Sequence, residues 1–142
     1  MKKALLTLLM FAVTATVFTG CKKDKDDDNG SIEGTWRSTK EVYYATVNGT
    51  RHGDEEVDNH SDARYDILTL SGGKYTVKEY YDGELEDTDE GTYTYSNGQL
   101  VIDGEATLKV KINGNTLVIV SEDLVDGEAK AAYVHETHYV KQ

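Results

Sequence analysis

The chain has one cysteine, no proline and few basic residues, and each of these shortages limits its structure or its partners. A single cysteine cannot form an intramolecular disulfide, so stability must come from a packed core and backbone hydrogen bonds. The absence of proline suits uninterrupted hydrogen-bonded strands. With 15 Lys and Arg against 26 Asp and Glu, the formal net charge of −11 makes nucleic acid and anionic lipid headgroups unfavourable partners.

A long apolar run is found at the N-terminus. Lys2 and Lys3 precede the run at 4–13, which gives way to small residues before Gly20. This is the layout of a secretory signal peptide, and the run is shorter than the about 20 apolar residues that a membrane-spanning helix needs. We therefore expect residues 1–20 to be a signal peptide.

The cysteine follows this segment directly, in the sequence Phe18-Thr19-Gly20-Cys21. These four residues resemble the lipobox of bacterial lipoproteins, in which the cysteine thiol is acylated and becomes the mature N-terminus. The resemblance implies a lipid anchor at Cys21, with acyl chains such as palmitate, since each buried methylene contributes about 0.8 kcal/mol to membrane binding. The alternative is an ordinary cleavable signal followed by a free cysteine.

Residues 21–31 form a tether rich in lysine and aspartate. It resembles the surface-export signal of Bacteroidetes-type lipoproteins, and this resemblance implies an outer-membrane location, lipid-anchored and exposed at the cell surface. A solvated spacer has the same composition, because like charges repel and nothing apolar is present to bury. Residues 32–142 remain as one domain of common size.

Apolar and polar residues alternate along most of this domain, as in half-buried strands. Turn signals at Gly72-Gly73, Asn97-Gly98 and Asn113-Gly114 separate the alternating segments. We expect eight antiparallel strands, at residues 35–47, 65–70, 74–81, 91–95, 99–102, 106–112, 116–121 and 131–141. An all-β meander of this size avoids exposed edges best by closing into an up-and-down barrel, which encloses either a side-chain core or one small ligand.

The segment Ile32-Glu33-Gly34-Thr35-Trp36 looks like the Gly-x-Trp signature of lipocalins, whose tryptophan closes the barrel floor. Residues 91–93, 100–102, 109–119 and 139–141 are similar to the small lipocalin-like domain lipoproteins of Bacteroidetes. The resemblance implies a lipocalin-like barrel over residues 32–142. Typical lipocalins also have a helix after the barrel and a late arginine beneath the tryptophan, whereas the arginines here are at positions 37, 51 and 64.

Catalytic signatures are missing from the sequence. His135-Glu136-Thr137-His138 lacks the four-residue histidine spacing that zinc proteases use on a helix, and on a strand its two histidines face opposite sides. No serine lies in a Gly-x-Ser-x-Gly turn, and the domain has no cysteine nucleophile. We therefore expect no catalysis, no catalytic residues and no cofactor.

Residues 51–62 collect five carboxylates and two histidines between the first two expected strands. Carboxylate and imidazole together can hold a divalent cation, but nothing in the sequence imposes ligand geometry. We predict a solvated loop that covers the open end of the barrel, and no metal site. The acidic stretch at 82–90 is predicted to be a hairpin tip.

Ten tyrosines are the marked excess in the composition. An apolar ring with a hydroxyl group suits the lining of a cavity for an amphipathic ligand, while tyrosine also has a high strand propensity and fills small barrels. The predicted ligand-binding residues are Trp36, Tyr93, Tyr95, Leu108, Val110 and Leu117. Ile112 and Ile119 are expected to face inward with them.

The sequence therefore predicts a lipid-anchored, lipocalin-like barrel of the cell envelope that binds a small amphipathic ligand and catalyses nothing. The alternative is an interaction module with a solid core, an accessory outer-membrane lipoprotein whose outer tyrosines and acidic loops contact a protein or a glycan. An apolar cavity open at the barrel mouth favours the first interpretation, and a filled interior favours the second.

Overall fold

The computed structural model describes residues 31–125 and 130–142, so Cys21 and the expected signal peptide lie outside the described residues. Within these ranges, no helix has the length and apolar character needed to cross a membrane. The described chain forms β1 (Gly34–Val47), β2 (Thr50–Asn59), β3 (Arg64–Ser71), β4 (Lys74–Tyr81), β5 (Glu84–Ser96), β6 (Gln99–Ile102), β7 (Ala106–Asn113), β8 (Thr116–Leu124) and β9 (Ala131–Lys141).

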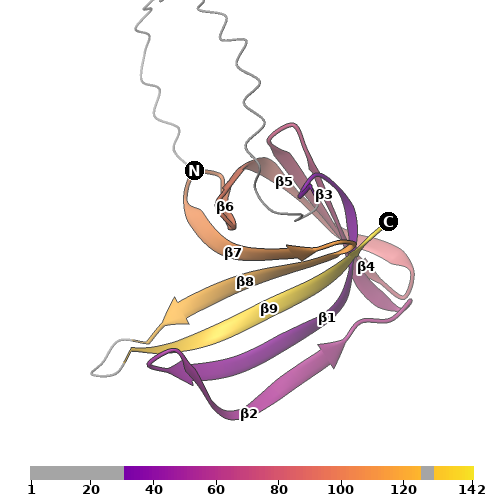
Figure 1. Ribbon diagram of the computed structural model, residues 1–142. Coiled ribbons are helices and arrows are strands. Elements are labelled where there is room, and N and C mark those ends of the chain that lie inside the picture. The colour runs from indigo at the N-terminus through magenta and orange to yellow at the C-terminus, as the bar shows by residue number, and fades with distance from the viewer. Residues whose placement is uncertain (1–30, 126–129) are drawn as a thin grey trace, which may run out of the picture.

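Strand β1 closes these strands into a barrel (Figure 1). From β3 to β9 each strand pairs antiparallel with the next, and β9 pairs along β1 from Trp36 opposite Lys141 to Val47 opposite Ala131. The other edge of β1 pairs with β3 at residues 34–37 and with β2 at residues 40–47. Strands β2 and β3 both run antiparallel to β1 and lie one after the other along the same edge of it. Together they therefore occupy one strand position of the barrel. The predicted eight-stranded antiparallel barrel is confirmed.

Two-residue turns join most neighbouring strands. Three of these turns consist of an Asn or Asp and a Gly that both have positive φ: 48–49, 82–83 and 97–98, and Asp103-Gly104 has the same φ signs within the three-residue connection between β6 and β7. Two successive residues with positive φ define a type I′ turn, whose twist matches that of antiparallel strands. Gly72 and Gly73, with φ of 56° and 77°, make an equivalent turn. The turns predicted at 72–73 and 97–98 connect strands as expected, and the third predicted turn lies one residue later, at Gly114-Asn115, because Asn113 ends β7.

Two segments predicted as loops are strands. Residues 51–59 belong to β2, which pairs with β1 from Val47 opposite Thr50 to Lys40 opposite Asn59, so they do not cover the open end as a loop. Strand β5 begins at Glu84, and the hairpin tip is confined to Asp82-Gly83. Strand pairing depends on context, and the backbone ladder with a neighbouring strand holds these charged segments extended despite their low strand propensity.

The hydrophobic core fills the end of the barrel where β1 begins. Trp36, Leu70, Leu100 and Leu117 are at most 1% exposed. The core cluster also contains Ile32, Leu68, Tyr75, Tyr93, Val110, Ile112 and Tyr139. The indole Nε1 of Trp36 donates a hydrogen bond of 2.9 Å to the Ile32 carbonyl, which ties the entering chain to the barrel floor.

A lysine supplies the cation that the lipocalin resemblance assigns to an arginine. The Nζ atom of Lys141 lies 5.1 Å from the centroid of the Trp36 ring, within the range of a cation–π contact. Lys141 is opposite Trp36 in the β1–β9 ladder, so the last strand of the barrel places this charge beside the first.

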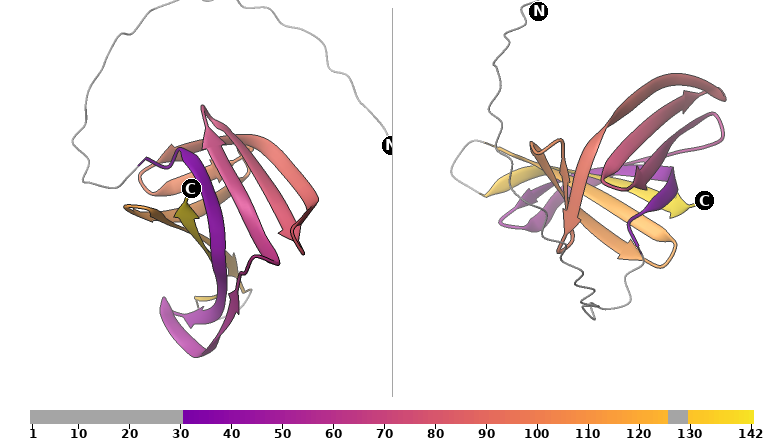
Figure 2. Two further views of the ribbon diagram at one scale, coloured as in Figure 1. Left: turned by 90° about the vertical axis from the view of Figure 1, so that its right-hand side faces the viewer. Right: turned by 90° about the horizontal axis from the view of Figure 1, so that it is seen from above.

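The long strands extend beyond the core as a twisted sheet, visible in two further views (Figure 2). Strand β7 pairs with β8 only as far as Val120, whereas β8 continues to Leu124 along β9. The inner face of this extension is therefore less covered, and Tyr43 and Tyr133 are 39% and 67% exposed.

Replacing Trp36 with alanine should cost about 3–5 kcal/mol of unfolding free energy, because it removes a fully buried ring and leaves a cavity. Chemical denaturation measures the change. Leu124→Ala is the control, since Leu124 is 80% exposed and its loss should change stability by no more than about 0.5 kcal/mol. An unchanged denaturation midpoint for Trp36→Ala would contradict the placement of this ring.

Candidate functional site

The barrel interior is not completely filled by side chains. A cavity of about 300 Å³ lies above the core, a volume at the lower end of the range for small-molecule sites. Its lining is mostly apolar, with a few polar groups: Leu68, Tyr75, Val77, Leu100, Ile102, Leu108, Ile119 and Tyr139, together with Asp89, Ser121, His135 and Thr137. The cavity therefore has the apolar walls and the sparse polar groups that an amphipathic molecule needs.

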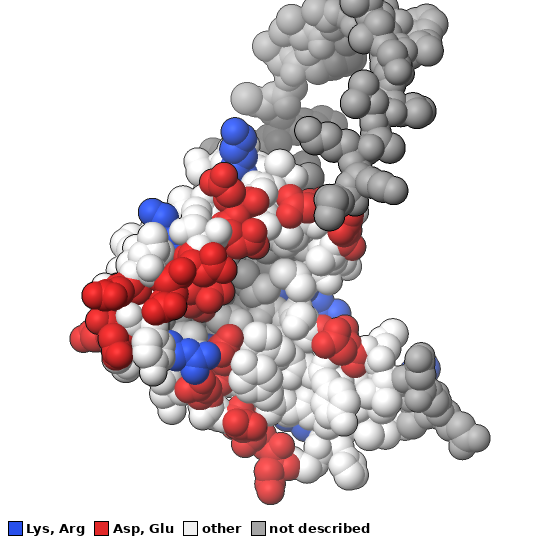
Figure 3. Space-filling view, turned by 180° about the vertical axis from the view of Figure 1, so that it is seen from behind, with Lys and Arg blue, Asp and Glu red and all other residues white. Residues whose placement is uncertain are grey.

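The inward-facing residues of β3 and β4 change from apolar to acidic toward the barrel mouth. Leu68 and Val77 line the cavity as a cross-strand pair, and two residues further along both strands Asp66 lies opposite Glu79. The two carboxylates belong to a second pocket, of about 510 Å³, lined also by Glu41, Arg64, Tyr80, Tyr81 and Glu86. Figure 3 shows Asp and Glu crowded on this side of the molecule, with few Lys and Arg among them.

Burial and mutual repulsion alter the acidity of these carboxyl groups. Burial raises the pKa of Asp66, and the charge of Glu41 adds to this effect while His60 and Arg64 oppose it. Burial also raises the pKa of Glu79, with Asp66 as the next contribution. Both groups therefore hold their protons more tightly than solvated carboxyl groups do.

Glu41 is the residue on which the mouth interactions converge. Its carboxylate lies 3.2 Å from His135 Nε2, 3.6 Å from His60 Nε2 and 3.7 Å from Arg64. The Tyr43 hydroxyl donates a hydrogen bond to it at 3.0 Å, and the Tyr43 ring stacks on His135 with the centroids 4.4 Å apart. These partners compensate a charge that β1 places on the inner face of the barrel.

His60 is held tightly at the break between β2 and β3. Its backbone N–H donates to the Thr39 carbonyl, and its Nδ1 lies 2.6 Å from Ser38 Oγ, which also accepts a hydrogen bond from Asp66 N–H. The imidazole is 2% exposed, yet its Nε2 atom has no hydrogen-bond partner in the described part of the chain. A buried polar atom left unpaired costs about 1–3 kcal/mol.

The structure distributes the predicted ligand-binding residues over three environments. Leu108 lines the cavity. Trp36, Tyr93, Val110 and Leu117 are buried in the core cluster and are not among the residues that line the cavity. They form the floor on which the cavity rests.

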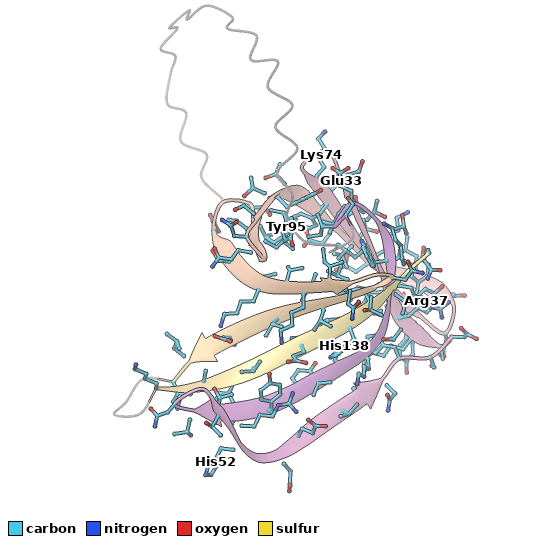
Figure 4. The ribbon with its side chains drawn as sticks, in the orientation of Figure 1. Glu33, Arg37, His52, Lys74, Tyr95 and His138 are labelled. Atoms are coloured by element: carbon cyan, nitrogen blue, oxygen red, sulfur yellow. The ribbon has the colours of Figure 1, made fainter. Side chains whose placement is uncertain are left out.

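Tyr95 does not lie in the interior as predicted. It is 37% exposed and lies near β6 (Figure 4). It comes directly before the last pair of the short β5–β6 ladder, Ser96 and Gln99, and the core cluster does not extend to it. The alternation that buries Tyr93 therefore does not bury Tyr95 at the end of the hairpin.

The sequence-based reasoning missed Tyr75, Tyr139 and the carboxylates of β3 and β4. The Tyr75 hydroxyl donates to Asp103 and Asp89 at 3.1 and 3.2 Å, and burial together with the hydrogen bond to Asp103 raises its pKa to about 12. The alternation of Asp66, Leu68 and Leu70 was a usable signal, because residues of one parity share one face.

The two histidines of the 135–138 segment point to opposite faces, as predicted for a strand. His135 pairs with Tyr43 on the inner face and lines the cavity. His138 Nε2 donates a hydrogen bond of 3.1 Å to the Glu136 carboxylate on the outer face. The two imidazoles therefore cannot share one metal ion.

A separate groove of about 530 Å³ lies on the outer face of β1, β8 and β9. The Tyr44 hydroxyl donates to Glu136 at 2.7 Å, and the Arg51 guanidinium lies 3.8 Å from the centroid of the Tyr44 ring. Burial alone would raise the pKa of Glu136, but hydrogen bonds from Tyr44 and His138 lower it below the ordinary value. Val134 and Ala132 form the apolar floor of this groove.

The closed antiparallel barrel, the tryptophan at its floor and the apolar interior together define a lipocalin-like architecture. The family model for the lipocalin-like domain matches residues 32–119, more than half of the chain. The chain therefore belongs to the lipocalin-like domain family. A comparison with curated proteins gave no match.

Asp66→Asn should raise the melting temperature at pH 7. The folded state raises the pKa of Asp66, so ionisation of this group opposes folding once the pH exceeds its ordinary value of 3.8. Below that value the wild-type group is protonated in both states, and the gain should shrink. Thermal unfolding at pH 7 and pH 3 checks this difference.

Asp54→Asn is the matched control, because it removes the same charge from an exposed position on β2. Equal gains from the two substitutions would attribute the effect to net charge and contradict a specific penalty at Asp66.

Proposed function

We propose that this lipocalin-like domain binds a small amphipathic ligand inside the barrel and performs no chemistry. The apolar part of the ligand lies in the cavity between Leu68, Leu108 and Ile119, and its polar part meets the acidic mouth. The observation that carries the proposal is the change from apolar to acidic side chains along β3 and β4. The inner face of these two strands is therefore apolar in the cavity and acidic at the mouth.

The mouth favours a polar group that donates hydrogen bonds or carries positive charge. Glu41, Asp66 and Glu79 offer carboxylate oxygens, which only accept when ionised. Among the described residues, Arg64 is the one cation that lines the same pocket. The polar groups that line the cavity itself, Asp89 and His135 among them, can orient the ligand.

The lipobox resemblance supports attachment of this domain to the outer membrane through acylated Cys21, with exposure at the cell surface. An anchored binding barrel would capture its ligand at the envelope, and the acidic tether would hold the domain away from anionic headgroups by repulsion. The same repulsion makes nucleic acid an unfavourable partner. Growth of producing cells with radiolabelled palmitate tests the anchor. The wild type should incorporate the label, and Cys21→Ser should not.

The alternative function is an interaction module that contacts a protein or a glycan. The outer groove favours it, because Tyr44, Arg51 and Glu136 combine an aromatic face with fixed charges over a buried apolar floor. The cavity in the barrel interior is the observation that ranks ligand binding above this alternative.

Leu108→Trp should abolish ligand binding, because the larger side chain fills the cavity that Leu108 lines. Native mass spectrometry of the full chain in detergent, incubated with lipid and metabolite extracts of a bacterial envelope, measures the binding. The wild type should carry a discrete added mass that Leu108→Trp lacks.

Leu124→Trp provides the control, since it adds the same side chain at an exposed position of β8. An added mass that persists in Leu108→Trp and disappears in Arg51→Ala would place the ligand in the outer groove. A bare mass with every extract would also contradict the proposal.

A further inference from the structure

We propose that Glu41, Asp58 and His60 form a binding site for a divalent transition-metal ion, with Zn²⁺ as the best fit, at the mouth of the barrel. Each residue offers one ligand atom, and the three atoms lie within 4.8 Å of one another. This site goes beyond the ligand binding proposed above and does not depend on it. The sequence predicted a solvated loop here and no metal.

The unpartnered nitrogen of His60 is the observation that separates this cluster from ordinary acidic surface. The imidazole is 2% exposed, and Nε2 faces Glu41 at 3.6 Å, which is too long for a hydrogen bond. A metal ion between the two side chains would use the Nε2 lone pair. The imidazole proton would then lie on Nδ1, where Ser38 Oγ at 2.6 Å can accept it.

The two carboxylates are placed together by the strand pairing. Glu41 and Asp58 are directly opposite each other on β1 and β2, an arrangement that is unfavourable for like charges. The Arg64 guanidinium relieves this repulsion, at 2.5 Å from Asp58 and 3.7 Å from Glu41. The Arg64 side chain is 53% exposed, so it can move into solvent when a divalent cation takes its place.

The ligand set favours zinc over the alkaline-earth ions. Imidazole suits zinc and other late first-row ions, whereas calcium and magnesium prefer oxygen ligands alone. Three protein ligands leave one tetrahedral position open. Because Glu41 also lines the acidic pocket, the metal ion would lie beside the region where the polar part of a ligand would lie.

The test measures Zn²⁺ binding by calorimetry, using the full chain in detergent, without a histidine tag and with Cys21→Ser so that the thiol is not a ligand. His60→Asn removes Nε2 and should weaken binding by more than about tenfold. Arg64→Gln should strengthen binding, because the competing cation is gone. His52→Asn is the control, since His52 is exposed on β2 and lies at the lower edge of the molecule (Figure 4).

A second measurement covers the case in which His60→Asn does not fold. Nitrogen NMR of the wild-type imidazoles should show a large shift of His60 Nε2 on addition of Zn²⁺. Unaltered His60 signals, or equal affinities for the wild type and a folded His60→Asn, overturn the site. Because the probe is the metal alone, these outcomes are independent of whether the cavity binds an organic ligand.

Discussion

The rest of the structure depends on the pairing of β1 with three other strands. One edge of this strand holds β9 from Trp36 to Val47, and the other edge holds β3 and then β2. That arrangement closes the barrel without a free edge at its first and last strands. It also places a buried tryptophan and a charged Glu41 on the inner face of one strand although they are five residues apart, because the β1–β9 register shifts between Ser38 and Lys40. The apolar floor and the polar mouth are therefore two ends of one element.

The break between β2 and β3 connects this architecture to the candidate site. Both strands run beside β1, and the chain between them turns inward far enough for His60 to be buried against Ser38. An unbroken strand would have continued the alternation of β2, whose side chains are mostly exposed. The irregularity thus brings an imidazole to a mouth otherwise lined by carboxylates, and it leaves one nitrogen of that imidazole without a partner among the described residues.

The sequence predicted the fold better than the site, for physical reasons. Alternation in segments such as 106–112 and the Asn-Gly turn at 97–98 are local signals, and together they gave the barrel and most of its strands. Strand β2 was missed although Asn48-Gly49 carries the same turn signal, because the charged residues that follow have low strand propensity and only the pairing with β1 holds them extended. Asp58 and His60 were recognised as metal-ligand types, but Glu41 reaches them through a cross-strand register that no local pattern encodes. Tyr95 failed in the opposite way: its parity was right, but the core cluster of the described residues does not extend to the end of its hairpin.

Methyl NMR of the labelled chain, titrated with the envelope extract, tests the central claim most directly, because methyl groups lie on both faces of the sheet. The account predicts shifts at the cavity residues Leu68, Leu108 and Ile119, and none at Val134, which lies on the outer face of β9. Shifts confined to Val134 and its outer-face neighbours, with the cavity methyls unchanged, would contradict a binding site inside the barrel.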